Sequence, residues 1–164
     1  MGELRVFFMS LDRLQAIRPS DHWALISIRD PMQQVQLNPA WKHLLTVEFK
    51  DSAYSLDDLH VSGRNKFNEC IRPAQAKEIT LFVDLCIKKQ SVNTIICQSN
   101  NYRRAAAVAR HIADLTNARL CQDTTYCNSF VYNMLTAPEK YQRALSEIGG
   151  PSYYQEAERK PLGS

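Results

Sequence analysis

The sequence contains no Cys-x-x-Cys pair, no lysine-rich block and no long apolar run. Its five cysteines are odd in number and lack the paired spacing of zinc ligands, which argues against a metal site. The longest apolar run near the N-terminus, from Val6 to Met9, is far shorter than the roughly 20 residues that cross a bilayer. A secretory signal pattern is also missing. These absences predict a protein of the reducing cytoplasm that needs no membrane, metal or cofactor.

Composition sets a second limit on function. The formal net charge is +3 over 164 residues, and no basic patch is interleaved with aromatic residues, so nucleic-acid binding is not expected. The mild positive charge suits an anionic partner. The hydrophobic content of 45% is ordinary for a globular protein. We expect one domain over residues 1–150 and a flexible tail over residues 151–164, where apolar residues are few.

Four apolar segments rich in β-branched residues predict strands, and helical patterns lie between or after them. The segment Trp23 to Ile28 is apolar almost throughout, which is typical of a strand buried on both faces of a parallel sheet. This alternation predicts the α/β class, a three-layer sandwich with a mostly parallel central sheet. The predicted strands are residues 4–9, 23–28, 43–49 and 92–97, and the predicted helices are residues 11–17, 73–90, 103–116, 128–135 and 138–148.

The most informative segment runs from Thr94 to Ala109. A predicted strand ends in Cys97, five residues intervene, and Arg103 opens an alanine-rich helix. Loop amides and a helix N-terminus attract an anion and stabilise a thiolate, and an arginine holds phosphate bidentately. Ligands of such sheets bind outside the carboxyl ends of the strands. We therefore predict a phosphate site, with a small buried hydrophobe at a strand end as the alternative interpretation of Cys97. The predicted site comprises Gln98, Ser99, Asn100, Asn101, Tyr102, Arg103 and Arg104.

Further segments, in the same order, make the chain resemble the small bacterial and phage members of the protein tyrosine phosphatase-like, dual-specificity superfamily. The segment Leu25-Ile-Ser-Ile-Arg-Asp-Pro31 is similar to an early strand of that family, and Leu45 to Asp51 is similar to a later strand ending in Phe-x-Asp. Asn128-Ser-Phe-Val-Tyr132 is similar to a segment after the loop helix. The resemblance covers roughly residues 4–136 and implies the cysteine phosphatase α/β sandwich.

The resemblance also implies a mechanism. Cys97 would attack phosphorus and form a thiophosphate enzyme, while Arg103 and the loop amides stabilise the transferring group. Asp51, which matches the Phe-x-Asp pattern, would protonate the leaving oxygen. A turn aspartate is the alternative interpretation of Asp51, and Asp57 and Asp58 are rivals for the acid. His60 is a further possible proton donor in the same polar segment.

Three positions depart from the family's loop pattern of His-Cys-x-x-Gly-x-x-Arg followed by Ser or Thr. Ile96 stands at the histidine position, Asn100 at the glycine and Arg104 at the hydroxyl residue. Asparagine tolerates left-handed backbone angles, so Asn100 is the mildest change. Arg104 removes a hydroxyl that helps the thiolate leave, although it adds a positive charge that lowers a neighbouring thiol pKa.

Several functions therefore stay open. The first is an enzyme, a cysteine phosphatase acting on phosphotyrosine or dual-specificity protein substrates or on another phosphate monoester. The second is a phosphate-binding protein on the same fold that has lost turnover. A third is the same chemistry on a nucleotide or RNA 5′ end, and a fourth is an interaction protein that uses the fold as a scaffold, because fold alone does not fix function.

Overall fold

The computed structural model describes residues 3–52 and 69–149. Asp57, Asp58 and His60 lie outside the described residues, as does the expected tail over residues 151–164. Within the described part, every helix is either too short or too polar to serve as a membrane span.

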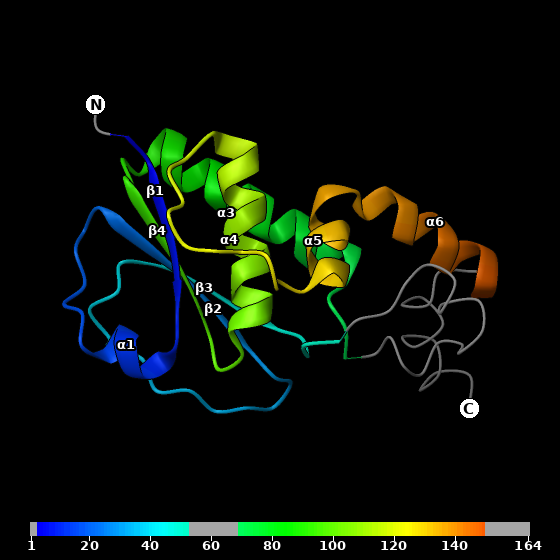
Figure 1. The fold of residues 1–164 in the computed structure, drawn as a ribbon, viewed down its shortest axis with the longest axis horizontal. Helices are drawn as coiled ribbons and strands as arrows, with labels where there is room; N and C mark the ends of the chain where they lie inside the picture. Colours follow the sequence, from blue (N-terminus) through cyan, green and yellow to red (C-terminus); the bar gives the residue numbers. More distant parts are fainter. Residues whose placement is uncertain (1–2, 53–68, 150–164) are drawn as a thin grey trace.

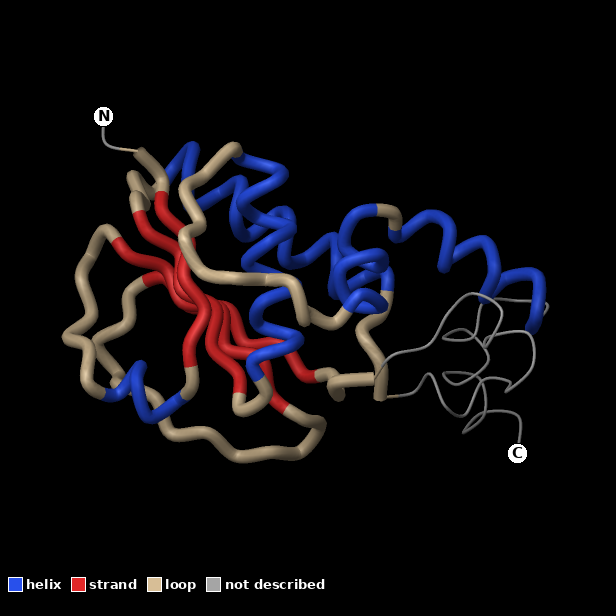
Figure 2. The backbone as a smooth tube through the Cα atoms, in the orientation of Figure 1, coloured by secondary structure: helices blue, strands red, loops and turns tan. Residues whose placement is uncertain are grey.

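The centre of the molecule is a sheet of four parallel strands in the order β1-β4-β2-β3. The strands lie side by side, and helices α3 and α4 cover one face of them (Figures 1 and 2). The expected α/β class with a parallel sheet is confirmed. The strands are β1 (Arg5–Met9), β2 (Trp23–Arg29), β3 (His43–Glu48) and β4 (Thr94–Ser99).

The larger apolar core lies between the sheet and the helices. Alternate residues of the central strands point into it, including Ile26 of β2 and Ile95 of β4, and both are fully buried. Helix α4 packs against β1, β4 and α5, and five of its consecutive residues, Ala105–Ala109, are buried. Small side chains let the helix approach the sheet closely, which explains the alanine-rich sequence. The helices on this side are α3 (Pro73–Lys89), α4 (Tyr102–Thr116), α5 (Ser129–Thr136) and α6 (Pro138–Gly149).

The opposite face of the sheet has a smaller core. Leu25 and Ile96 point to this side and pack with Leu14 of α1 (Leu11–Gln15) and with Trp41. Figure 1 shows α1 on the side of the sheet away from α4. One short helix and the loops over residues 30–42 thus form the third layer, which agrees with a three-layer α/β arrangement.

Local capping explains several helix boundaries. The side chain of Ser10 accepts a hydrogen bond from the Arg13 amide at the start of α1, as expected of an N-cap serine. Pro73 is the first residue of α3, where its missing N–H costs nothing. Asn117 ends α4 in the left-handed conformation, at φ 58°. These were the sequence signals for the three helices.

The edge of the sheet at β1 is covered by the segment that follows α4. The Arg119 amide donates to the Leu4 carbonyl at 2.8 Å, and the Val6 amide donates to the Arg119 carbonyl at 3.0 Å. The Gln122 side chain binds both the amide and the carbonyl of Phe8, each at 2.8 Å. Backbone groups that would otherwise be an open template for pairing are therefore satisfied.

One predicted boundary is wrong in a way that matters for the site. The sequence predicted that the fourth strand ends at Cys97, but β4 continues to Ser99 and α4 begins at Tyr102. Only Asn100 and Asn101 therefore connect strand to helix. The extra strand residues pair with neighbours on both sides, with Gln98 beside Met9 and Ser99 beside Ile28.

Candidate functional site

The carboxyl ends of β2 and β4 form a crevice. These strands are neighbours, but the chain leaves β4 toward α4 on one face and leaves β2 toward the loop over residues 30–42 on the other (Figure 1). Such a divergence is where open α/β sheets bind ligands. A cavity of about 330 Å³ lies there. Its described lining residues are Asp30, Lys50, Asp51, Ser52, Asn100, Asn101 and Arg104.

Arg104 is the central residue of this crevice. It lies in the first turn of α4, and its side chain is only 2% exposed. Its Nε donates to Ser99 Oγ at 2.5 Å, and its Nη1 donates to Asp30 Oδ1 at 2.6 Å and to the Phe49 carbonyl at 2.5 Å. One guanidinium thus ties together the ends of β2, β3 and β4. Nη2 makes no hydrogen bond to another residue in the described part of the chain.

Arg103 and Asp51, which the sequence placed in one site, do lie together. Nη1 of Arg103 is 3.5 Å from Oδ2 of Asp51, and the side chains are 42% and 14% exposed. The distance is longer than a strong charge-assisted hydrogen bond, and the arginine is largely in water. This ion pair is therefore weak, and Arg103 can turn toward another anion at little cost.

Asn128 holds Asp51 in place and was not among the predicted site residues. Its side chain is fully buried. Nδ2 donates to Asp51 Oδ1 at 2.5 Å and to the Ser52 carbonyl at 2.8 Å, while Oδ1 caps α5 by accepting from the Val131 amide at 3.0 Å. Its backbone amide donates to the Arg103 carbonyl at 2.9 Å. Asn128 therefore joins the starts of α4 and α5 to the end of β3.

Charges in the crevice come in pairs. Arg104 pairs with Asp30, Arg103 with Asp51, and Lys50 Nζ lies 2.5 Å from Glu69 Oε2. The site thus presents cations and carboxylates side by side rather than an excess of one sign. In the described part of the chain, no three His, Cys, Asp or Glu residues gather as metal ligands.

Cys97 does not open into this crevice. Its side chain is fully buried, and it lies in the larger apolar core between the sheet and the helices. In the sheet it pairs with Phe8 on one side and Ile26 on the other. Burial strongly raises the pKa of the Cys97 thiol above its ordinary value, so the thiolate is disfavoured. The structure therefore matches the alternative sequence interpretation, a small buried hydrophobe near a strand end.

Two of the amides of residues 98–103 are bound by side chains of the same segment. Gln98 points to the opposite face of the sheet, where its Oε1 accepts from Ser27 Oγ at 2.6 Å. The Asn101 amide donates to Ser99 Oγ at 3.3 Å, and the Arg103 amide donates to Asn101 Oδ1 at 2.9 Å. Local side chains therefore occupy these two loop amides.

The burial of Cys97 predicts a clear difference in thiol reactivity. Alkylation of the native protein by iodoacetamide should modify the exposed Cys121 and leave Cys97 intact, because only an accessible thiolate reacts. Peptide mass spectrometry after timed quenching measures this. Cys97 should become reactive only when the chain is unfolded in guanidinium. Rapid modification of Cys97 in the native protein would contradict the buried position.

Sequence reasoning found part of the crevice. Of the lining residues it named Asp51, Asn100, Asn101 and Arg104, and it missed Asp30, Lys50 and Ser52. Their signal is present in the sequence, since Lys50 directly follows a predicted strand and Asp30 and Ser52 lie within three residues of one, and parallel strand ends share one edge. Asn128 lies 77 residues from Asp51, so no local pattern joins them.

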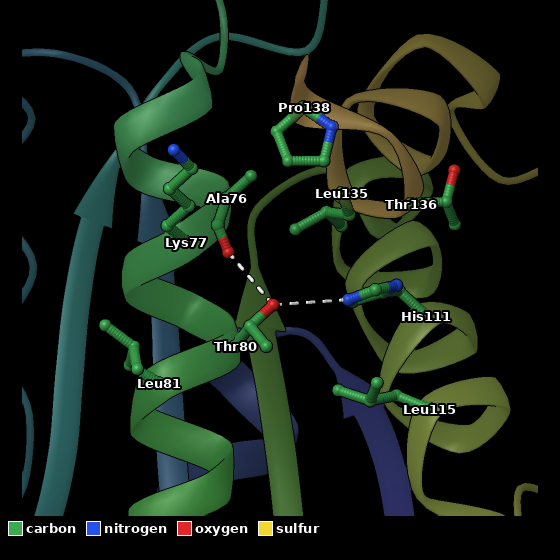
Figure 3. Close-up of a pocket in the computed structure, with 9 residues that line it drawn as sticks. All are labelled: Ala76, Lys77, Thr80, Leu81, His111, Leu115, Leu135, Thr136 and Pro138. Carbon is green, nitrogen blue, oxygen red and sulfur yellow. Dashed lines mark hydrogen bonds between the residues drawn. The ribbon is translucent and has the colours of Figure 1, made fainter. Parts of the chain in front are cut away.

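A second cavity, of about 420 Å³, lies between α3 and the helices α4 and α5 (Figure 3). It is mostly apolar, and two leucines beside it are exposed, Leu81 at 68% and Leu115 at 52%. The polar residues among its lining are Lys77, Thr80, His111 and Thr136. Thr80 Oγ1 donates to the Ala76 carbonyl and lies 3.5 Å from His111 Nε2.

His111 predicts a pH dependence of stability. Burial lowers the pKa of His111 from its ordinary 6.5, with a smaller opposing effect from Asp114. The unfolded chain therefore binds a proton near pH 6.5 before the native chain does, so the free energy of unfolding should fall as the pH drops below 6.5. The slope contributed by one such histidine is at most about 1.4 kcal/mol per pH unit. Urea unfolding of the wild type and His111→Gln between pH 5 and 8 measures it, and identical slopes would contradict the prediction.

Comparison of the chain with family models, with curated proteins and with solved structures gives no match.

Proposed function

We propose that this protein binds a phosphate-bearing ligand in the crevice at the ends of β2, β3 and β4, and that it does not hydrolyse the ligand through Cys97. The observation that carries the proposal is the buried Arg104 guanidinium. It lines the cavity, and its Nη2 lacks a partner in the described part of the chain. A guanidinium held by three fixed acceptors offers its remaining donors in a preorganised direction, which suits a tetrahedral anion.

The start of α4 supports the same anion. The first amides of a helix have no acceptor within it, and the helix dipole places partial positive charge there. Asn101 satisfies the Arg103 amide only. Arg104 belongs to the same first turn, so an anion bound there would meet both fixed dipoles and a full charge.

Arg103 supplies a second, movable cation. The 3.5 Å contact of Arg103 with Asp51 is partly exposed and contributes little to stability, so breaking this contact costs little free energy. When a phosphate enters, Arg103 would turn to it, while Asn128 keeps Asp51 in place. The resemblance to the tyrosine phosphatase-like superfamily supports phosphate as the anion in question.

The proposed function includes no reaction at the Cys97 thiol, because of the position of that residue. A nucleophile must reach phosphorus as a thiolate, but this thiol is fully buried, and burial raises its pKa. The replaced loop positions, Ile96 and Arg104, agree with a site that no longer turns over substrate. The proposal therefore follows the phosphate-binding alternative rather than the phosphatase.

Titration with inorganic phosphate and with phenyl phosphate, followed by amide chemical shifts, tests binding. We expect shifts at Asn100, Asn101 and the start of α4, and a loss of affinity of about tenfold for Arg103→Ala. Arg143→Ala, which removes an exposed arginine of α6, is the matched control and should bind like the wild type. Absence of any binding would refute the proposal.

Hydrolysis of p-nitrophenyl phosphate tests the second part of the proposal, that the protein does not hydrolyse its ligand through Cys97. No turnover is expected from the wild type. Turnover that disappears in Cys97→Ser would instead restore the phosphatase mechanism, and would require the strand end to rearrange so that the thiol reaches the crevice.

A further inference from the structure

We infer that the ligand of the crevice is a phosphate ester of a polyhydroxyl body, such as a sugar or ribose, rather than the aryl phosphate of a phosphotyrosine. This inference rests on the proposed phosphate site and specifies what is attached to the phosphate. It depends on the chemistry of the cavity walls, described below.

Every described residue that lines the cavity is polar or charged. Small-molecule sites are mostly apolar, with a few polar groups, so an all-polar lining is unusual. An aromatic ring placed here would lose water and meet no apolar residue among the described lining, only the carbon atoms of polar residues. The nearby aromatic residue Tyr102 is 51% exposed and is not part of the lining. The cavity therefore disfavours phenyl and favours a body that can hydrogen-bond over its whole surface.

The carboxylates specify donors on the ligand. Asp30 lines the cavity and is 51% exposed; its Oδ1 accepts from Arg104, while its Oδ2 has no partner in the described part of the chain. A carboxylate oxygen next to a phosphate site repels a bare anion, but it accepts hydrogen bonds from hydroxyl groups. A ligand with hydroxyls beside its phosphate turns this repulsion into an attraction.

Asn100 adds an uncommitted amide. It lies in the two-residue connection between β4 and α4, it is exposed, and its side chain makes no hydrogen bond to any described residue. An amide offers two donors and an acceptor, which suits a hydroxyl-bearing body. Ser52 lines the same cavity on the β3 side. The volume of about 330 Å³ is at the small end of ligand pockets, which fits a single sugar phosphate.

Isothermal titration with ribose 5-phosphate, phenyl phosphate, inorganic phosphate and ribose tests the inference. We expect ribose 5-phosphate to bind about tenfold more tightly than phenyl phosphate, because hydrogen bonds to a charged acceptor contribute at this level. Adenosine 5′-monophosphate distinguishes a nucleotide ligand from a free sugar phosphate. Tighter binding than ribose 5-phosphate indicates a nucleotide, and weaker binding indicates a free sugar phosphate.

Two variants test which residues cause the preference for ribose 5-phosphate over phenyl phosphate. Asp30→Asn and Asn100→Ala should each lower the ratio of ribose 5-phosphate to phenyl phosphate affinity, while Asn133→Ala, an exposed asparagine of α5, should leave the ratio unchanged. Asn100→Ala removes no side-chain hydrogen bond to a described residue, so it keeps the test valid if Asp30→Asn unfolds the chain. Phenyl phosphate binding as tightly as ribose 5-phosphate would overturn the inference and leave the phosphate site intact. If no phosphate compound binds, the proposed function itself is refuted. If ribose binds as tightly as ribose 5-phosphate, both the proposed phosphate site and this inference are refuted.

Discussion

Arg104→Met is expected to lower the free energy of unfolding by about 3 kcal/mol. The substitution keeps most of the apolar stem but leaves Ser99 Oγ, the Phe49 carbonyl and Asp30 without their shared donor. Ser99 and Phe49 are both buried, so water replaces the guanidinium poorly. Guanidinium chloride unfolding, followed by the fluorescence of the tryptophans, measures the change.

The adjacent arginine is the matched control. The Arg103 side chain is 42% exposed, and among the described residues its one ion pair is the 3.5 Å contact with Asp51, so Arg103→Met should cost less than about 1 kcal/mol. The two variants should thus separate stability, which depends on Arg104, from ligand affinity, to which Arg103 contributes. Equal losses of stability in the two variants would show that Arg104 is not the internal link between the strand ends.

Asn128→Ala is expected to cost about 3 kcal/mol of unfolding free energy. It removes the N-cap of α5 and both donors to the end of β3, at Asp51 and at the Ser52 carbonyl. Asp51 would then lose its fixed orientation, so affinity for inorganic phosphate should change as well. Chemical unfolding and phosphate titration on the same variant measure the two effects.

Asn101→Ala provides the comparison, since Asn101 also caps a helix but makes its cap on the surface. Loss of an exposed cap should cost about 1 kcal/mol. Asn128→Ser restores a capping oxygen without the amide donors and should fall between the two alanine variants. A loss in Asn128→Ala no larger than that in Asn101→Ala would contradict the proposed link between α5 and the crevice.

Much of the fold could be predicted because its signals are local. The apolar run of β2 predicted a strand buried on both faces, and the capping preferences of Ser10, Pro73 and Asn117 predicted helix ends. Strand and helix periodicities depend on neighbours a few residues away, so they survive in a single sequence. The strand boundary at Cys97 was less predictable, because polar Gln98 and Ser99 look like a loop until their neighbours in the sheet are known.

That boundary changed the meaning of the site. Side chains alternate between faces along a strand, so the continuation of β4 commits Cys97 to the apolar core and Gln98 to the opposite face. The sequence pattern had treated both as members of one loop around a phosphate. The residue at the centre of the crevice is consequently Arg104 rather than Cys97, and the proposed anion site is built on Arg104.

The sequence by itself determined the α/β class, the order of strands and helices, and the edge of the sheet at which polar groups gather. Those properties follow from hydrophobic period and from the rule that parallel strands end together. Only the tertiary structure decided which of two adjacent arginines turns inward, and that Asn128 meets Asp51 across 77 residues. Such contacts depend on the order of strands in the sheet and on how the helices pack against it. No stretch of neighbouring residues encodes them.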